Sequence, residues 1–297
     1  MSVLSIGTFD GIHLGHRQLL QRVRDLSQSR GMESVVISFR DHPAFTLKPE
    51  ALPGLLCPSA IKEQELLRLG IDRVVILDFT PELAHTSAMN FLEDYLIPKW
   101  QPKVFVVGYD SHFGKNREGN RDFLMQHAPR FGYEVEFVEP SLDNGRVISS
   151  SRIRNLLMSR HVEEANRLLG RPYRLLGKIH RGLAKGRDFG FPTANLQLSN
   201  PHQLIPALGL YLSKVQIEQG TFFGLTNIGK SPTVKHSGIV EIETFLLGFD
   251  SDIYGATMQV ELLKYIREEK MFENTELLIQ AMHRDLALAK SLIEEMQ

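Results

Sequence analysis

The sequence predicts two domains of different classes: an α/β domain with a parallel sheet over residues 1–170, and an antiparallel β-barrel with a C-terminal helix over residues 171–297. Three observations support this prediction. Short apolar runs alternate with amphipathic helical stretches up to Gly170, which is typical of a parallel sheet covered on both faces. Beyond Gly170, strand-like runs separated by turns dominate. The glycine, followed by Arg171 and Pro172, marks a helix end and the boundary.

In the first domain, five apolar runs are predicted to be the strands of the sheet. Stretches with apolar residues at helical spacing lie between and after them. The predicted strands are Val3–Ile6, Ser34–Phe39, Val74–Leu77, Val104–Val107 and Val135–Val138, and the predicted helices include Leu19–Leu26, Ile61–Leu69, Met89–Leu96, Phe123–Phe131 and Val162–Leu169. The helix that starts at Met89 is expected to end before Pro98, because proline lacks the amide hydrogen that a helix interior uses.

In the second domain, turns separate five strand-like runs, and one long helix closes the chain. The runs are Arg174–His180, Tyr211–Ile217, Phe222–Leu225, Ile239–Leu247 and Met258–Ile266, and the helix is Thr275–Glu295. This pattern predicts an antiparallel barrel closed by a C-terminal helix.

Composition narrows the class of protein. The 297 residues carry a net charge of −1 and a single cysteine. Basic and acidic residues are balanced on both sides of Gly170, which argues against a nucleic-acid partner. One cysteine excludes a disulfide framework and favours a reducing cytoplasm. No signal peptide is apparent, and no apolar run approaches the roughly 20 residues of a membrane helix. We expect a cytoplasmic monomer or weak homo-oligomer that binds small molecules.

Two histidines lie where the first strand passes into the first helix. His13 and His16 are three residues apart, so both imidazoles lie on one face of the first turn. Amide groups at a helix start lack internal partners, the dipole there is positive, and glycines let a ligand approach closely. This combination favours a phosphate site. For the His-x-x-His spacing alone, zinc and ordinary polar residues are the alternatives, and Cys57 is too distant in sequence to favour zinc.

The full string from Gly7 to His16 resembles the HxGH signature of nucleotidyltransferases, and is most similar to the FMN adenylyltransferase module of bacterial FAD synthetases. In those enzymes the histidines hold the nucleotide phosphates while the α-phosphorus is attacked. The resemblance implies that His13 and His16 are catalytic and that Gly7, Phe9 and Gly15 contact ATP. Class I tRNA synthetases share HxGH, but no RNA-binding appendage is apparent here.

A second motif opens a later helix. Its three serines, Ser149–Ser151, are of the type preferred at a helix N-cap. A helix has one N-cap residue, so capping explains the presence of only one of them. Arg154 in the first turn is unusual, since a cation is unfavourable at a helix N-terminus unless a phosphate lies there. The run is similar to Ser-Ser-Thr-x-Ile-Arg of the same family, with Ser151 in place of threonine. The resemblance implies that Ser150 and Ser151 contact ATP and that Arg154 acts on the outgoing pyrophosphate.

The fourth predicted strand runs into a glycine-rich loop. The loop is similar to the family's Gly-x-Asp-Phe-x-Phe-Gly and retains both glycines, Asp110 and Phe113. The resemblance implies that these two side chains contact the flavin. Ser111 replaces an expected aromatic residue and His112 an often basic one. Loss of one aromatic contact, about 1 kcal/mol, is expected to weaken flavin binding.

A second set of motifs lies beyond Gly170. Thr193 and Asn195 are oxygen donors two residues apart, so on extended backbone they face the same way and suit one Mg²⁺, although turn chemistry is the simpler interpretation of such a pair. The string from Gly190 to Asn195 is similar to the signature of riboflavin kinases, as are Asn227–Thr233 and Asp252–Gly255. The resemblance implies that Thr193 and Asn195 hold Mg²⁺ with ATP. It also implies ATP contacts by the glycines of the preceding loop, Gly182, Gly186 and Gly190.

Glu243 is a carboxylate in an otherwise apolar strand. A kinase needs a base that accepts the hydroxyl proton, and by position Glu243 matches that base in riboflavin kinases. Glu241, which shares its strand face, is the rival, and a solvent-facing glutamate is the simpler interpretation. Phe245 and Gly248 stand where the family often has His and Asp.

Both motif sets occur in order over nearly the whole chain. The resemblance implies a bifunctional enzyme that phosphorylates riboflavin to FMN on the barrel and then joins FMN to a second ATP on the α/β domain, giving FAD and pyrophosphate. Arg267 and Phe272 resemble the wall that faces the flavin in the kinase half. Two alternatives stay open: a single-activity enzyme with one degenerate domain, and a non-enzymatic flavin-binding regulator.

Overall fold

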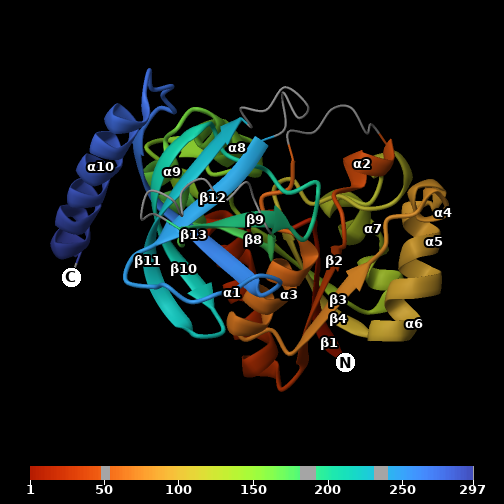
Figure 1. Ribbon diagram of the computed structural model, residues 1–297. Coiled ribbons are helices and arrows are strands. Elements are labelled where there is room, and N and C mark those ends of the chain that lie inside the picture. Colours follow the sequence, from red (N-terminus) through yellow and green to blue (C-terminus); the bar gives the residue numbers. More distant parts are fainter. Residues whose placement is uncertain (48–53, 181–191, 231–239, 297) are drawn as a thin grey trace. The chain divides into compact units, whose positions relative to one another are not determined.

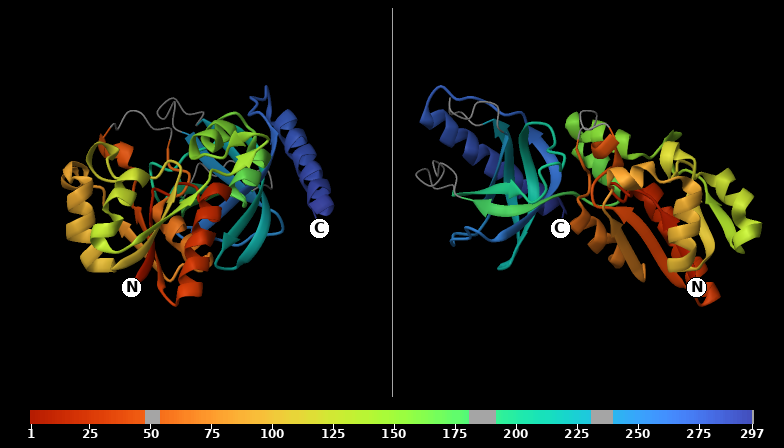
Figure 2. Two further views of the ribbon diagram at one scale, coloured as in Figure 1. Left: turned by 180° about the vertical axis from the view of Figure 1, so that it is seen from behind. Right: turned by 90° about the vertical axis from the view of Figure 1, so that its right-hand side faces the viewer.

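The computed structural model describes residues 1–47, 54–180, 192–230 and 240–296. Gly182, Gly186 and Gly190, predicted to bind ATP, lie outside the described residues. The chain forms two compact units, Met1–Ile153 and Arg154–Gln297. Figures 1 and 2 show their elements.

Five parallel strands form the sheet of the first unit in the order β3-β2-β1-β4-β5, which confirms the predicted parallel α/β fold. The strands are β1 (Ser2–Ile6), β2 (Glu33–Phe39), β3 (Arg73–Leu77), β4 (Pro102–Gly108) and β5 (Glu134–Val138). The chain moves outward from β1 to β3 and then crosses back to β4 on the other side of β1. The switch point therefore lies at the carboxyl ends of β1 and β4, where open α/β sheets bind ligands.

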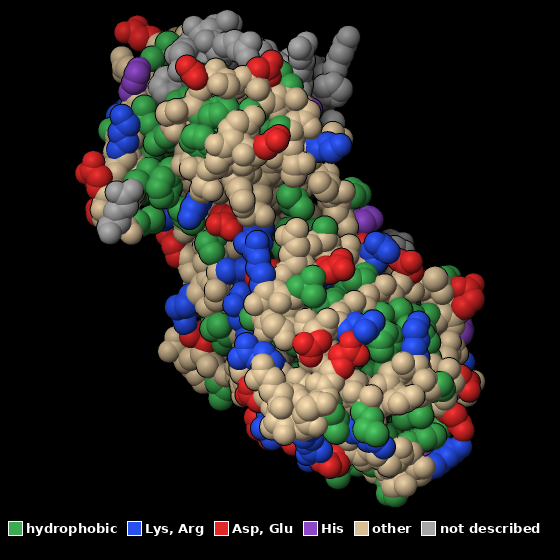
Figure 3. Space-filling view, turned by 90° about the horizontal axis from the view of Figure 1, so that it is seen from below, with side chains coloured by type: hydrophobic (Ala, Val, Ile, Leu, Met, Phe, Trp, Pro, Cys, Tyr) green, Lys and Arg blue, Asp and Glu red, His purple; other side chains and the backbone are tan. Residues whose placement is uncertain are grey.

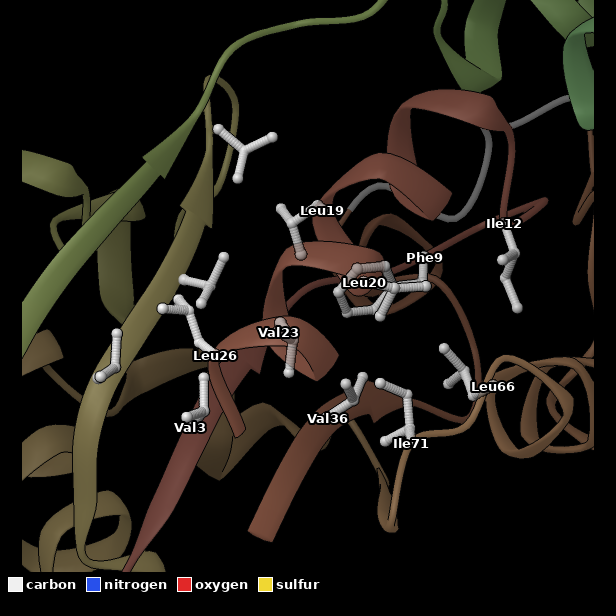
Figure 4. Packing of buried hydrophobic residues seen from close by; sticks show 13 residues of the cluster. Val3, Phe9, Ile12, Leu19, Leu20, Val23, Leu26, Val36, Leu66 and Ile71 are labelled. Atoms are coloured by element: carbon white, nitrogen blue, oxygen red, sulfur yellow. The ribbon is translucent and has the colours of Figure 1, made fainter. Parts of the chain in front are cut away.

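Helices cover both faces of this sheet because successive strand residues point to opposite sides. On one face, α1 (Leu14–Arg30) and α3 (Ser59–Arg68) contribute to a buried cluster with Val3 and Val36, shown in Figure 4. On the other face, Leu4 and its neighbours pack with residues of η1 (Phe91–Leu96) and α7 (Arg121–Phe131). Both faces of each central strand are thus apolar, as the sequence indicates.

The helix near Pro98 differs from its prediction. It continues through the proline as α5 (Ala88–Asn90), the π-helical η1 and α6 (Ile97–Trp100). The amide of Ile97 bonds to the carbonyl of Leu92, five residues back, which is the π pattern. Pro98 therefore falls in the opening turn of α6, where a missing amide hydrogen costs least.

Short elements complete the first unit. The hairpin of β6 (Leu142–Asp143) and β7 (Arg146–Val147) was not predicted, and its turn has Asn144 at φ 49° and Gly145 at φ 72°. The remaining elements are α2 (Pro43–Leu47), α4 (Pro81–His85) and the 3₁₀ turn η2 (Lys115–Arg117).

The second unit contains a closed barrel in the order β10-β11-β12-β9-β8-β13, which confirms the predicted architecture. Its strands are β8 (Tyr173–His180), β9 (Thr193–Leu198), β10 (Gly209–Ile217), β11 (Gly220–Lys230), β12 (Val240–Leu246) and β13 (Thr257–Arg267); β9 was not among the predicted strands. The predicted C-terminal helix is α10 (Thr275–Met296), whose Ala289 and Leu292 pack on Leu210, Leu212 and Leu225 of the barrel.

Two helices lie between the sheet and the barrel in sequence. α8 (Ser150–Met158) spans the division between the units, and α9 (Val162–Leu169) ends at Gly170 with φ 68°. Because α9 packs on β13 and β8, the division by packing falls before it rather than at Gly170. The predicted domain boundary at Gly170 stays a prediction.

The surface shows mixed charge. Figure 3 shows basic and acidic side chains side by side over the face that it presents, in keeping with the net charge of −1. None of the helices in the described ranges has the length and apolar character needed to span a membrane.

Candidate active sites

His13 and His16 meet at the start of α1. His13 is the N-cap residue, and its Nδ1 accepts a hydrogen bond from the backbone amide of His16 at 3.3 Å. The two imidazoles stack with centroids 3.7 Å apart and 15° between their planes. Since His13 Nδ1 is an acceptor, the neutral ring carries its proton on Nε2, which is left as a donor.

The loop before α1 is strained and apolar at two points. Phe9 and Ile12 adopt φ 46° and 45°, in the left-handed region that few residues other than glycine occupy. Both side chains are buried in the core under α1, and the ring of Phe9 lies edge-on to His16 at 5.3 Å. The core therefore holds the loop in a conformation that costs about 1 kcal/mol or more per residue, which is typical of ligand-binding loops.

Gly7 and Gly15 allow this loop to fold closely on itself. A Cβ at Gly15 would lie 3.2 Å from the ring of His13, and one at Gly7 would lie 3.1 Å from the ring of Phe9. Any side chain at Gly15 would therefore press directly on the capping imidazole.

Both histidines are neutral near pH 7. Burial lowers the pKa of His13 to about 4, against the opposing effect of Asp10. Burial, His13 and Lys62 together hold the pKa of His16 well below its usual value. Within the described structure, His16 Nδ1 is buried and has no hydrogen-bond partner. A buried polar atom without a partner at a helix start is consistent with a site completed by a ligand.

The serines of the second motif divide their roles. Ser149 caps α8 by accepting a hydrogen bond from the amide of Arg152 at 3.3 Å. The hydroxyl of Ser150 donates to the carbonyl of Asp10 at 2.8 Å, which ties this motif to the histidine loop. Ser151 is exposed, and Arg154, in the second unit, is 5% exposed.

A small cavity of about 30 Å³ adjoins the histidines, and its wall includes His13, Gly15, His16, Gly108 and Asp110. The structure thus brings the predicted flavin contact Asp110 beside the predicted phosphate site.

Phe113 lies elsewhere in the same loop. Its ring packs against Phe91 and Phe123, with centroids 5.9 Å away in each case. The hydroxyl of Ser111, at the position where the family has an aromatic residue, accepts a hydrogen bond from the amide of Gly108 at 2.9 Å and so closes the turn. A flavin contact by Phe113 stays a prediction.

The predicted base of the barrel lies in a row of polar residues. Glu243 on β12 is opposite Asn195 on β9 and Asn227 on β11, and Asn195 is in turn opposite His180 on β8. Residues in register on neighbouring strands share a face, so these side chains lie side by side. Thr193 follows the same face of β9, two residues from Asn195.

Negative charge surrounds Glu243. Burial raises the pKa of its carboxyl group, Glu241 and Glu269 raise it further, and His180 acts in the opposite direction. The carboxylate of Glu269 lies over the backbone of β11, because a Cβ at Gly229 would be 2.1 Å from its Oε1. A raised pKa makes Glu243 a stronger base than an ordinary glutamate.

A cavity of about 480 Å³ opens in the second unit. Its wall is formed by Ile179, Pro192–Ala194, Leu246 and Phe249–Tyr254. Its volume falls in the range typical of small-molecule sites. Thr193 lines this cavity, and Glu243 and Asn195 are not part of its wall.

The predicted flavin-facing residues of the barrel lie near α10. Arg267 forms a two-pronged ion pair with Asp285, with Nη2 to Oδ2 at 2.7 Å and Nε to Oδ1 at 3.0 Å. Its guanidinium carbon is 6.0 Å from the centre of the Phe272 ring. The geometry makes Arg267 a clamp between β13 and α10, and a flavin contact stays a prediction.

Sequence reasoning missed three features of these sites. The loop at Asp250 and Ser251, identified only as a turn, lines the large cavity. Glu269 was not singled out because it lies beyond the strand that carries the signature. Lys62 is buried near the histidine loop. The sequence feature that could have identified it is a cation in the first turn of a helix, the feature that also drew attention to Arg154. Among the described residues, no group of three or more His, Cys, Asp or Glu side chains is arranged to hold a metal.

Comparison with known proteins assigns both halves to the same class. The family model for FAD synthetase matches residues 1–152, and that for riboflavin kinase matches residues 169–293. The two units are thus those of transferases that make flavin nucleotides.

Full-length relatives carry both halves. The chain is 36% identical over 98% of its length to a bifunctional riboflavin kinase/FMN adenylyltransferase of Pseudomonas fluorescens, covering 92% of that protein, and 33% identical over 97% of its length to the one of Escherichia coli K12, covering 91%. A crystal structure described as a macrolide-efflux protein from Streptococcus pneumoniae matches with a TM-score of 0.86 at 30% identity, over 97% of this chain and 94% of that one. The chain belongs to the bifunctional riboflavin kinase/FMN adenylyltransferase family and makes FAD from riboflavin.

Proposed function

We propose that the two reactions are divided between the two sites, with riboflavin phosphorylated on the barrel and FMN adenylylated at the start of α1. The observation that carries this division is that each site has its own chemistry. The barrel holds a carboxylate with a raised pKa, suited to accept a proton, whereas the histidine loop has neutral imidazoles and a helix start, suited to phosphates.

On the barrel, Glu243 accepts the proton of the riboflavin 5′-hydroxyl as that oxygen attacks the γ-phosphorus of ATP, whose bond to the bridging oxygen breaks so that ADP leaves. The hydroxyl of Thr193 and the amide oxygen of Asn195 are hard donors on one face of β9, and they fit a Mg²⁺ ion that enters with ATP. The ion supplies charge neutralisation on the phosphates. The glycines at 182, 186 and 190 are proposed to contact the same ATP.

In the α/β half, the FMN phosphate attacks the α-phosphorus of a second ATP, and pyrophosphate leaves. No protein nucleophile is required, because the attacking group is the substrate's own phosphate. His13 Nε2 donates to the phosphates, Ser150, Ser151 and Arg154 receive the pyrophosphate, and Gly7 and Gly15 let the backbone approach. Rate enhancement comes from placement and charge stabilisation.

The assignment extends to organisation. We place the functional boundary at 1–170 and 171–297, and we propose a cytoplasmic protein that is monomeric or weakly associated. The chain has a single cysteine, Cys57, which is buried, and this composition supports the proposal of a reducing compartment.

Matched substitutions test the division. His16→Ala is expected to abolish FAD formation from supplied FMN and to leave FMN formation from riboflavin intact. Glu243→Gln is expected to do the reverse. Both products are resolved by chromatography after incubation with MgATP. A folded variant of either kind that loses both activities equally contradicts separate sites.

A further inference from the structure

Lys62 is a buried cation beside the histidine loop that the proposed mechanism does not use. It lies in the first turn of α3 and is 3% exposed. The positive end of the helix dipole disfavours a cation there, and burial is costly for any lysine. Among the described residues, no carboxylate lies within ion-pair distance of its Nζ. The helix dipole, the burial and the lack of a carboxylate partner in the described part of the chain all make this position unfavourable for a lysine. We therefore expect a role that compensates for this cost.

The ammonium group is connected to the phosphate loop by hydrogen bonds. Lys62 Nζ donates to the carbonyl of Phe39 at 2.7 Å and to the hydroxyl of Ser38 at 3.2 Å, both at the carboxyl end of β2. The hydroxyl of Ser38 donates in turn to the carbonyl of Thr8 at 3.0 Å. Thr8 immediately precedes Phe9, one of the two residues with strained backbone, so the chain of bonds ends on the strained loop.

The charge of Lys62 also reaches the histidines. It is one of the groups that hold the pKa of His16 low, the others being burial and His13. Burial lowers the pKa of Lys62 itself, against the opposing effects of Asp10, Cys57 and Asp41. The carboxylate of Asp10 is bonded to the amides of Leu56 and Cys57 at 3.2 and 2.9 Å. Lys62 Nζ donates to two oxygen atoms, and its ammonium form is the one that an incoming polyanion can use.

We propose that Lys62 is a positioning residue of the adenylyltransferase site. Through Ser38 it holds the loop at Gly7–Ile12 in the shape that receives the ATP phosphates, and its buried charge favours the bound polyphosphate over the empty site. This inference rests on the proposed function of the histidine loop. It predicts an effect on the binding of MgATP in FAD formation and none on riboflavin phosphorylation.

The test separates the charge from the hydrogen bonds. Lys62→Gln keeps a donor to Ser38 and Phe39 but removes the charge, Lys62→Met removes both, and Ser38→Ala keeps the charge and cuts the connection to Thr8. For each variant, kcat and KM for MgATP are measured in FAD formation from supplied FMN. FMN formation from riboflavin by the same preparation and the melting temperature serve as controls.

Lys62→Gln is expected to raise the KM for MgATP about tenfold or more, with a smaller change in kcat and unchanged FMN formation. Ser38→Ala is expected to raise the KM only about two- to threefold, because the charge remains. A folded Lys62→Gln variant with an unchanged KM overturns the proposal, as does one that loses both activities in parallel. If neither Lys62 variant folds, the residue serves the fold and the proposal is also overturned.

His16→Ala tells a failure of the proposed role of Lys62 apart from a failure of the adenylyltransferase site assignment. If it abolishes FAD formation while Lys62→Gln does not change the KM, the histidine loop keeps its function and only the role of Lys62 is lost. If both leave FAD formation intact, the assignment of the adenylyltransferase site itself fails.

Discussion

The Nδ1 atom of His13 accepts the backbone amide of His16 while the two rings stack 3.7 Å apart, so one residue both starts the helix and sets the position of its neighbour. Structure and chemistry are joined in this pair. A substitution at His13 can affect both the N-cap hydrogen bond and the stacked imidazole ring. Different side chains can replace His13 in each of these two roles.

Substitutions at His13 separate the cap from the imidazole. Asparagine is a good N-cap residue and alanine is not, so His13→Ala is expected to lose about 1 kcal/mol of unfolding free energy relative to His13→Asn. Both are expected to lose most FAD formation, since neither has an imidazole. Urea unfolding and the FAD assay measure the two effects, and equal stability of the two variants would show that the cap contributes nothing.

The depressed pKa of His13 predicts acid sensitivity. Between the ordinary value of 6.5 and the folded value of about 4, the unfolded chain binds a proton that the folded chain does not. Stability is therefore complete above pH 6.5 and falls as the pH drops toward 4, by up to about 3 kcal/mol from this group. His16 acts in the same direction. His13→Asn is expected to flatten this part of the curve of unfolding free energy against pH, and an unchanged slope would contradict the assignment.

Gly15→Ala is expected to impair FAD formation selectively. The new Cβ would lie 3.2 Å from the His13 ring, and neither the ring nor the helix start can move freely. We expect a loss of about tenfold in kcat/KM for adenylylation, because small displacements of a binding group are costly in rate. Riboflavin phosphorylation in the same preparation is the control, and a parallel loss of both would indicate unfolding instead.

The acidic surroundings of Glu243 predict a shift in the pH profile of the kinase. Glu269 raises the pKa of Glu243, so Glu269→Gln is expected to lower it. The acid limb of FMN formation reports protonation of the base, and it should move to lower pH in this variant. Glu218→Gln, at an exposed turn of the same barrel, is the matched control and should leave the profile unchanged. A profile that does not move for Glu269→Gln would argue that another group is the base.

The Arg267–Asp285 pair predicts a stability effect at α10. Asp285→Asn is expected to lower the unfolding free energy by about 1 kcal/mol, a value kept small because Arg267 is partly exposed. A double-mutant cycle with Arg267→Met isolates the pair. If Arg267 also contacts the flavin, its substitution raises the KM for riboflavin more than Asp285→Asn does. Equal effects would make the clamp its sole role.

Sequence periodicity was sufficient for the sheet and most of the barrel, because both depend on long apolar runs. It failed where a single local feature decides the structure. Pro98 continues a helix because a π turn precedes it, and such a turn has no periodic signature. The hairpin around Asn144 did have a signal, since Asn-Gly favours positive φ at both turn positions, and that signal was overlooked.

Candidate site residues were predictable where a motif is contiguous. The Ser150 hydroxyl bonds to the loop that carries the histidines, and Thr193 and Asn195 share a strand face, while their roles stay predictions. The partners brought by tertiary packing were not predictable: Glu269 reaches Glu243 from beyond β13, and Lys62 reaches the histidine loop from α3. Phe113 shows the opposite case: it belongs to a recognised motif, but its ring packs against Phe91.

The ring of strands in the second unit has a consequence for how copies of the protein can meet. β10 is bonded to β11 on one side and to β13 on the other, so neither of its backbone edges is available to another molecule. In the described strands each barrel strand has two neighbours, so none of them is an edge strand. Association through this half is therefore expected to rely on side chains rather than on the addition of a strand.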